Sequence, residues 1–312
     1  MRKVIGLATA AMLLCAAGQD QAPSRDELVV SPDELVASEV EGEPAQLHIV
    51  SAGPDRLVLN QAFVTRHGLS PAGIMGRADL SVSGRREFKG YNRPVPFAVG
   101  GRRQRTRAFW FVGAPPSVGD GSVGPWVLPQ SKVTFVLAPL AAGQGRYDMP
   151  LTGGIDSASL TGWKEASFGM TVAFDLDSAE RYPVATAAAG AAIAAAYGGT
   201  LSGPSWDFEV GMGVRRPVRL MTLARPFAMP PFAFTRIAVR VRDRVDEAGR
   251  GEAIREEGQV DDPDEIVVTA NWKGRPPAFG LTIPRPALAA CARLSFDKAA
   301  KRVSLWCRPS QG

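Results

Sequence analysis

The sequence predicts a mainly β protein with two similar halves and few short helices. Three observations support this fold class. The chain has 33 glycines and 25 prolines among 312 residues, and they interrupt short apolar runs rich in valine, phenylalanine and leucine. Long amphipathic helical patterns are scarce. The same order of strand, turn and short helix occurs twice along the chain, which indicates an internal duplication.

The chain begins with an expected export signal. A basic start precedes an apolar run from Val4 to Leu14, and small residues follow. This pattern is typical of a secretory signal peptide, which we place at residues 1–18. The apolar run is too short for a membrane span, which needs about twenty residues. We therefore expect an exported, periplasmic protein, with lipid anchoring through Cys15 as the less favoured alternative.

The first half is expected to follow a flexible leader. Residues 19–45 are polar, acidic and free of aromatic side chains, which is typical of a disordered segment. The first half then covers residues 46–140, with a short helix that ends near Gly68. Its strands are expected at residues 47–50, 57–59, 95–99, 107–112 and 132–137.

The second half, residues 146–308, repeats this layout. A strand at residues 182–186, a small-residue turn at 187–190 and a helix at 191–197 match the start of the first half. Residues 242–265 are charged and contain few large apolar side chains. We expect them to form a disordered insertion in the second half.

Charge and cysteine content narrow the function classes. Arginines and lysines concentrate in residues 85–107, where solvated hairpin edges are the simplest interpretation and an anionic envelope polymer or acidic peptide is the alternative partner. Nucleic acid is not expected as a partner of an exported protein. We expect Cys291 and Cys307 to form a structural disulfide worth about 3 kcal/mol.

The two histidines of the chain, together with one disulfide, leave too few ligands for a zinc site. We therefore expect neither a metal nor another cofactor. No later segment is apolar and long enough to span a bilayer, and the chain is expected to be a monomer.

The duplicated layout resembles the aspartic protease family of pepsins and retropepsins. The sequence Ser51-Ala52-Gly53, followed by RLVLN, stands where the family has its first Asp-Thr-Gly turn. VATAAAG at residues 184–190 stands where the second turn is expected. DGSVGPWVLP at residues 120–129 resembles the family's Asp-Gly-Ile-Leu-Gly segment. The resemblance implies two lobes, each with a flap hairpin, and a cleft between them.

The resemblance also implies a catalytic pair that this sequence lacks. In the family, one aspartate from each lobe activates a shared water molecule. Here Ser51 or Val50 takes the first position, and Thr186 or a neighbouring alanine takes the second, so we predict no catalytic residue. The expected cleft residues are Ser51, Ala52, Gly53, Tyr91, Thr186, Ala187 and Gly190. The expected function is non-catalytic binding of a peptide or envelope ligand.

Two other functions stay open at this point. The chain could be an active aspartic-type endopeptidase with carboxylates at other positions, and Asp156 lies in an Asp-Ser-Ala sequence that resembles the turn. Alternatively, DEIVVTA at residues 264–270 resembles the TonB box of outer-membrane receptors, a segment that binds by adding a strand to a sheet. This second resemblance favours contact with TonB or an outer-membrane receptor in a Gram-negative periplasm.

Overall fold

The structure is a computed structural model that describes residues 26–53, 55–82, 86–153, 158–165, 167–241 and 279–309. The protein is mainly β, as predicted. The expected signal peptide, the insertion at residues 242–265, the segment at residues 264–270 and Asp156 lie outside the described residues. None of the helices in the described ranges is long and apolar enough to cross a membrane.

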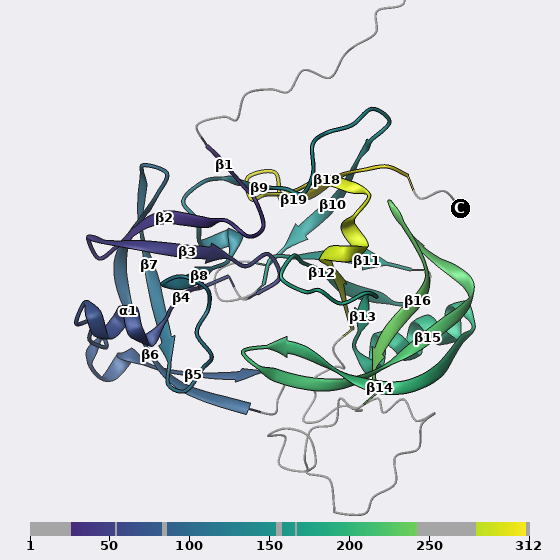
Figure 1. Cartoon of the computed structure of the whole chain (residues 1–312), viewed down its shortest axis with the longest axis horizontal. Helices are drawn as coiled ribbons and strands as arrows, with labels where there is room; N and C mark the ends of the chain where they lie inside the picture. The colour runs from purple at the N-terminus through teal and green to yellow at the C-terminus, as the bar shows by residue number, and fades with distance from the viewer. Residues whose placement is uncertain are drawn as a thin grey trace, which may run out of the picture.

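The N-terminal half forms a seven-stranded sheet in the order β2-β3-β8-β4-β7-β6-β5 (Figure 1). Its strands are β2 (Leu35–Val40), β3 (Glu43–Ile49), β4 (Leu57–Leu59), β5 (Arg77–Val82), β6 (Arg86–Val99), β7 (Arg102–Phe111) and β8 (Gly121–Val123). Helix α1 (Gln61–Arg66) follows β4, and the 3-10 helices η1 (Gly73–Gly76) and η2 (Pro125–Val127) precede β5 and follow β8.

The other strands form a twelve-stranded sheet in the order β1-β9-β18-β19-β10-β11-β12-β17-β13-β16-β15-β14. They are β1 (Glu27–Val30), β9 (Lys132–Val136), β10 (Gly145–Thr152), β11 (Leu160–Lys164), β12 (Gly169–Asp175), β13 (Val184–Ala185), β14 (Gly199–Gly211), β15 (Val214–Met229), β16 (Phe232–Arg240), β17 (Gly280–Pro284), β18 (Cys291–Asp297) and β19 (Arg302–Cys307). Helix α2 (Ala187–Tyr197) follows β13, and the 3-10 helix η3 (Arg285–Leu288) follows β17.

The two halves repeat one set of strand pairings. In the N-terminal half, β3 runs parallel to β8, β8 runs antiparallel to β4, and β4 runs parallel to β7. In the C-terminal half, β12 is parallel to β17, β17 is antiparallel to β13, and β13 is parallel to β16. A helix follows the third strand of each set, and a 3-10 helix follows β8 and β17. The two halves therefore share a recurring topology.

One end of the large sheet joins the two halves. Strand β9 lies between β1 and β18, and β18 in turn pairs with β19. Segments from both ends of the chain thus lie side by side (Figure 1). Phe135 of β9 and Phe296 of β18 are completely buried there, with their rings edge to face at 6.1 Å. A single buried apolar cluster extends through both halves.

The expectation of a flexible leader at residues 19–45 is wrong for the part that the structure describes. Strands β1 and β2 and the start of β3 occupy it, and Val30 and Val40 are buried. Three of the acidic side chains form ion pairs with arginines of the β6–β7 hairpin, which lies far away in the sequence. The ion pairs are Asp26–Arg102, Glu39–Arg103 and Glu41–Arg93, at 2.6, 3.2 and 3.0 Å.

The predicted small-residue turn at residues 187–190 is also wrong, because these residues form the first turn of α2. Thr186 is the N-cap, and its hydroxyl accepts a hydrogen bond from the Ala189 amide at 3.3 Å. A Cβ on Gly190 would lie 2.3 Å from Val239, so only glycine permits this close packing of α2 on β16. The predicted end of the helix is confirmed, with Gly198 in the left-handed region at φ 75°.

The predicted disulfide is confirmed. Cys291 and Cys307 lie directly opposite each other in the antiparallel pair of β18 and β19, and their sulfur atoms are bonded. Both residues are buried.

Candidate functional site

Two turns meet where the halves join, and the strand pairings define which residues of the turns correspond. Ile49 of β3 pairs with Val123, and Phe174 of β12 pairs with Ile283. Val123 and Ile283 each stand two residues before the start of a 3-10 helix. The residues that follow Ile49 and Phe174 are therefore equivalent: Val50 corresponds to Asp175, and Ser51 corresponds to Leu176.

Ser51 connects the two turns. Its hydroxyl donates a hydrogen bond to the carbonyl oxygen of Phe174 at 2.7 Å and accepts one from the amide of Leu176 at 3.0 Å. The Ser51 side chain is completely buried. These two bonds straddle Asp175, so the hydroxyl fixes the turn of the C-terminal half around that carboxylate.

Asp175 supplies a carboxylate at the position equivalent to Val50. One of its carboxylate oxygens accepts hydrogen bonds from the amides of Asp177 and Ser178, at 3.1 and 3.2 Å. Burial raises the pKa of the Asp175 carboxyl above its usual value, and the nearby charge of Asp177 adds to the shift. The two amide hydrogen bonds act in the opposite direction. Val50, at the equivalent position of the other half, supplies no ionisable group.

Charged pairs surround the junction. His48 of β3 lies 2.7 Å from a carboxylate oxygen of Asp177, and this hydrogen bond raises the pKa of the imidazole against the opposing effect of burial. Arg285, at the start of η3, pairs with Asp33 at 2.7 Å. Each pair joins an N-terminal residue to a C-terminal one, so the halves are held in register by polar contacts as well as by the shared sheet.

Asp55 forms a second buried polar link between the halves. Its carboxylate accepts hydrogen bonds from the Trp126 amide at 2.9 Å and from the Ser159 hydroxyl at 2.8 Å. Burial raises the pKa of Asp55 to about 6. Lys298 donates hydrogen bonds to the carbonyls of Trp126 and Leu128, and burial lowers its pKa to about 8. These bonds identify Asp55 as a structural group that ties one turn to the neighbouring segments.

The β14–β15 hairpin crosses from the C-terminal half to the N-terminal sheet (Figure 1). Val214, near its tip, is buried in a small apolar cluster with Phe88, Phe109 and Phe111 of β6 and β7. Gly213 in the tip, with φ 73°, approaches Pro115. The two halves thus make a second contact here. The β14–β15 hairpin that makes it has a topological equivalent in the N-terminal half, the β5–β6 hairpin.

The predicted cleft residues divide into three groups. Ser51, Ala52 and Gly53 lie at the junction of the halves, next to residues 174–178. Tyr91 lies on β6 between Arg77 and Trp110. The residue is 38% exposed, and its ring centroid is 6.1 Å from that of Trp110.

Thr186, Ala187 and Gly190 form the third group, at the start of α2. They occupy the place that corresponds to Asn60 and α1 in the other half. The turn equivalent to residues 50–53 is therefore residues 175–178, one strand earlier than the sequence interpretation placed it. The alternating apolar pattern of β12, which ends at Asp175, resembles that of β3, which Val50 directly follows.

Within the described ranges, no group of three or more histidine, cysteine, aspartate or glutamate side chains is arranged to hold a metal ion. No protein-family model matches the chain, and no curated protein matches it.

Proposed function

We propose that this chain is a non-catalytic, exported protein of the two-lobed aspartic protease type, which binds an extended peptide or envelope ligand between its halves. The observation that carries the proposal is the Ser51 contact. It brings together two topologically equivalent turns, and the position that is Val50 in one turn is a carboxylate, Asp175, in the other. The repeated strand pairings support the same architecture.

The proposed protein is non-catalytic because Val50 stands where the second catalytic carboxylate would be needed. Hydrolysis in that family needs one carboxylate as base on a water molecule and a protonated partner as acid. Val50 can accept or donate no proton. Asp175, with its raised pKa, would instead serve as a hydrogen-bonding group for the backbone of a bound peptide. The buried disulfide agrees with an oxidising, periplasmic location.

Binding and cleavage can be tested together. The purified mature chain is incubated between pH 4 and 7 with a mixture of peptides from an unfolded, carboxymethylated protein. Bound peptides are recovered by rapid gel filtration and counted by mass spectrometry, and cleavage is followed in the same samples. The proposal requires retained peptides without new termini. A sample that shows no retained peptide and no cleavage would refute the proposal.

Adding a bulky side chain at the junction of the halves tests whether the peptide binds there. Ala52→Trp would fill the space next to Ser51, and we expect it to abolish peptide retention. Ala228→Trp is the matched control, because Ala228 is exposed on β15, where it pairs with Ala233 of β16. Equal retention by the two variants would show that the ligand binds elsewhere.

An active peptidase is the second candidate, and one observation favours it: the raised pKa of Asp175 is the property expected of a catalytic acid. Cleavage that is blocked by a transition-state inhibitor of aspartic proteases, and lost in Asp175→Asn, would replace the binding proposal. Cleavage that survives in Asp175→Asn would indicate a contaminating protease.

A further inference from the structure

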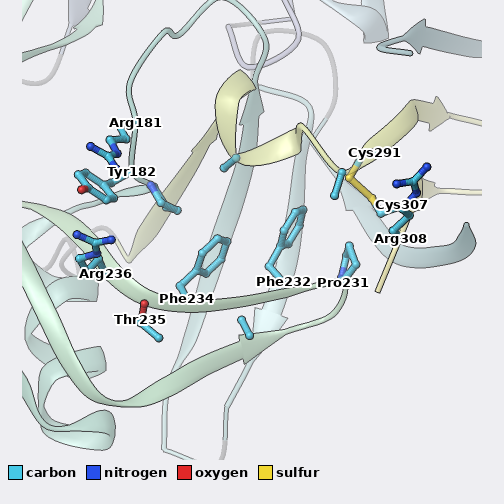
Figure 2. A pocket seen from close by; sticks show the side chains of 14 residues that line it. Arg181, Tyr182, Pro231, Phe232, Phe234, Thr235, Arg236, Cys291, Cys307 and Arg308 are labelled. Carbon is cyan, nitrogen blue, oxygen red and sulfur yellow. A yellow bond between two sulfur atoms is a disulfide. The ribbon is translucent and has the colours of Figure 1, made fainter. Parts of the chain in front are cut away.

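A groove of about 320 Å³ lies in the C-terminal half, between β16, the segment after η3 and the residues that precede β13 (Figure 2). Its floor is apolar: Phe232 and Phe234 project into it from β16, and their rings lie parallel with centroids 5.4 Å apart. Pro231 and the Cys291–Cys307 disulfide close one end. The walls of the groove are thus formed by β16, by the η3 region and by the Cys291–Cys307 disulfide.

Arginines stand at both ends of this groove. Arg181 and Arg236 lie at one end, with their guanidinium carbons 5.4 and 5.3 Å from the centre of the Tyr182 ring, and Arg308 lies at the other (Figure 2). Within the part of the chain that the structure describes, none of the three forms an ion pair with a carboxylate. The carboxylate of the neighbouring Glu180 instead accepts a hydrogen bond from the Trp206 indole.

The floor strand has an open edge. Strand β16 pairs with β15 along one side, from Phe232 to Arg240. Along its other side it pairs with β13 only at Ala238 and Val239. Among the described residues, positions 232–237 therefore have no strand partner on the side of β13. An open edge of this kind can accept another extended chain through backbone hydrogen bonds.

We propose that this groove binds an extended acidic segment of a partner polypeptide. The segment would add as a strand along residues 232–237 and place aliphatic side chains against Phe232 and Phe234. Its acidic side chains would pair with Arg181 and Arg236 at one end and with Arg308 at the other. Charge complementarity and the open edge together select a peptide, because an anionic lipid or a free phosphate makes no use of strand pairing.

The test measures binding of a fluorescein-labelled peptide, Glu-Asp-Val-Ile-Val-Asp-Glu, by fluorescence anisotropy. Arg236→Glu should raise Kd at least about tenfold, since it replaces a charge-assisted hydrogen bond with repulsion. Arg105→Glu is the matched control: Arg105 is exposed on β7 without an ion pair among the described residues, and Kd should stay within about twofold. Both substitutions are at exposed positions, so folding should persist, which circular dichroism verifies.

Two altered peptides separate strand pairing from simple charge attraction. A peptide with lysine at all four acidic positions should not bind. A peptide with N-methylated valines keeps its charge but lacks the amide hydrogens for strand pairing, so its Kd should also rise at least about tenfold. Unchanged binding of the N-methylated peptide would overturn the proposal, as would equal effects of Arg236→Glu and Arg105→Glu.

Other occupants give distinct results, each of which contradicts the proposal. Binding to phosphatidylglycerol vesicles that Arg236→Glu abolishes, without peptide binding, would identify a lipid surface. Self-association in sedimentation velocity that Arg236→Glu abolishes would identify a second copy. Peptide binding that appears only after deletion of residues 245–262 would identify this acidic segment as the occupant. Ala52→Trp should leave binding in the groove unchanged, which separates this inference from the proposed function.

Discussion

Removing the Ser51 hydroxyl should destabilise the protein by about 2–4 kcal/mol. The side chain is completely buried, and its two hydrogen bonds to Phe174 and Leu176 connect the halves. A net hydrogen bond is worth about 1 kcal/mol, and a buried polar group left without its partner costs about 1–3 kcal/mol. Ser51→Ala removes no methylene, so the loss is almost wholly polar. The expected loss is a large fraction of a typical stability of about 5–15 kcal/mol.

The measurement is equilibrium unfolding in urea, followed by tryptophan fluorescence. Ser122→Ala is the matched control, because Ser122 lies half-buried on β8 and its hydroxyl forms no hydrogen bond within the described residues. The control should change the free energy of unfolding by no more than about 0.5 kcal/mol. A Ser51→Ala variant that is as stable as the control would show that the hydroxyl does not tie the halves together, and the reasoning about the junction would fail.

Three further predictions concern buried or paired groups. Because the pKa of Asp55 is raised to about 6 in the folded state, that state holds the proton more tightly than the unfolded chain, so stability should fall as pH rises from about 4 to 6. Urea unfolding at several pH values should show this slope in the wild type, and Asp55→Asn should abolish it. The imidazole of His48 should titrate above its ordinary value of 6.5, and Asp177→Asn should lower its pKa in an NMR titration; the stability that this pair contributes is present below about pH 6.5 and is lost as pH rises through the folded pKa. Replacing Cys291 and Cys307 together with alanine should cost about 3 kcal/mol in urea unfolding, and a double variant as stable as the wild type would contradict a structural role.

Local signals allowed good prediction of part of this fold. The strand-turn-strand-helix order from β3 to α1 could be read from short apolar runs and their turn residues. The disulfide followed from the even number of cysteines left after the expected signal peptide. These features depend on neighbouring residues or on composition, and the sequence shows both directly.

The errors arose where distant segments decide the outcome. Residues 26–45 resemble a disordered leader in composition, but three of their carboxylates pair with Arg93, Arg102 and Arg103 in the folded structure. The position of Asp175 at the junction depends on a distant segment too. Its role depends on β12 running parallel to β17, more than a hundred residues later, and that pairing leaves no mark on the local sequence. The alanines after Thr186 suggested a turn, although alanine is the best helix former.

The shared sheet also dictates an order of folding. Strand β9 directly follows the strands of the N-terminal sheet in the chain, yet among the described residues one of its edges is paired by β18, which the ribosome delivers more than 150 residues later. Until then Phe135 and the backbone of β9 lack their native cover, and an uncovered edge invites aggregation. We therefore expect β9 to complete its native pairing only after β18 has been synthesised. A truncation that removes β18 and β19 should leave both halves unable to complete their fold.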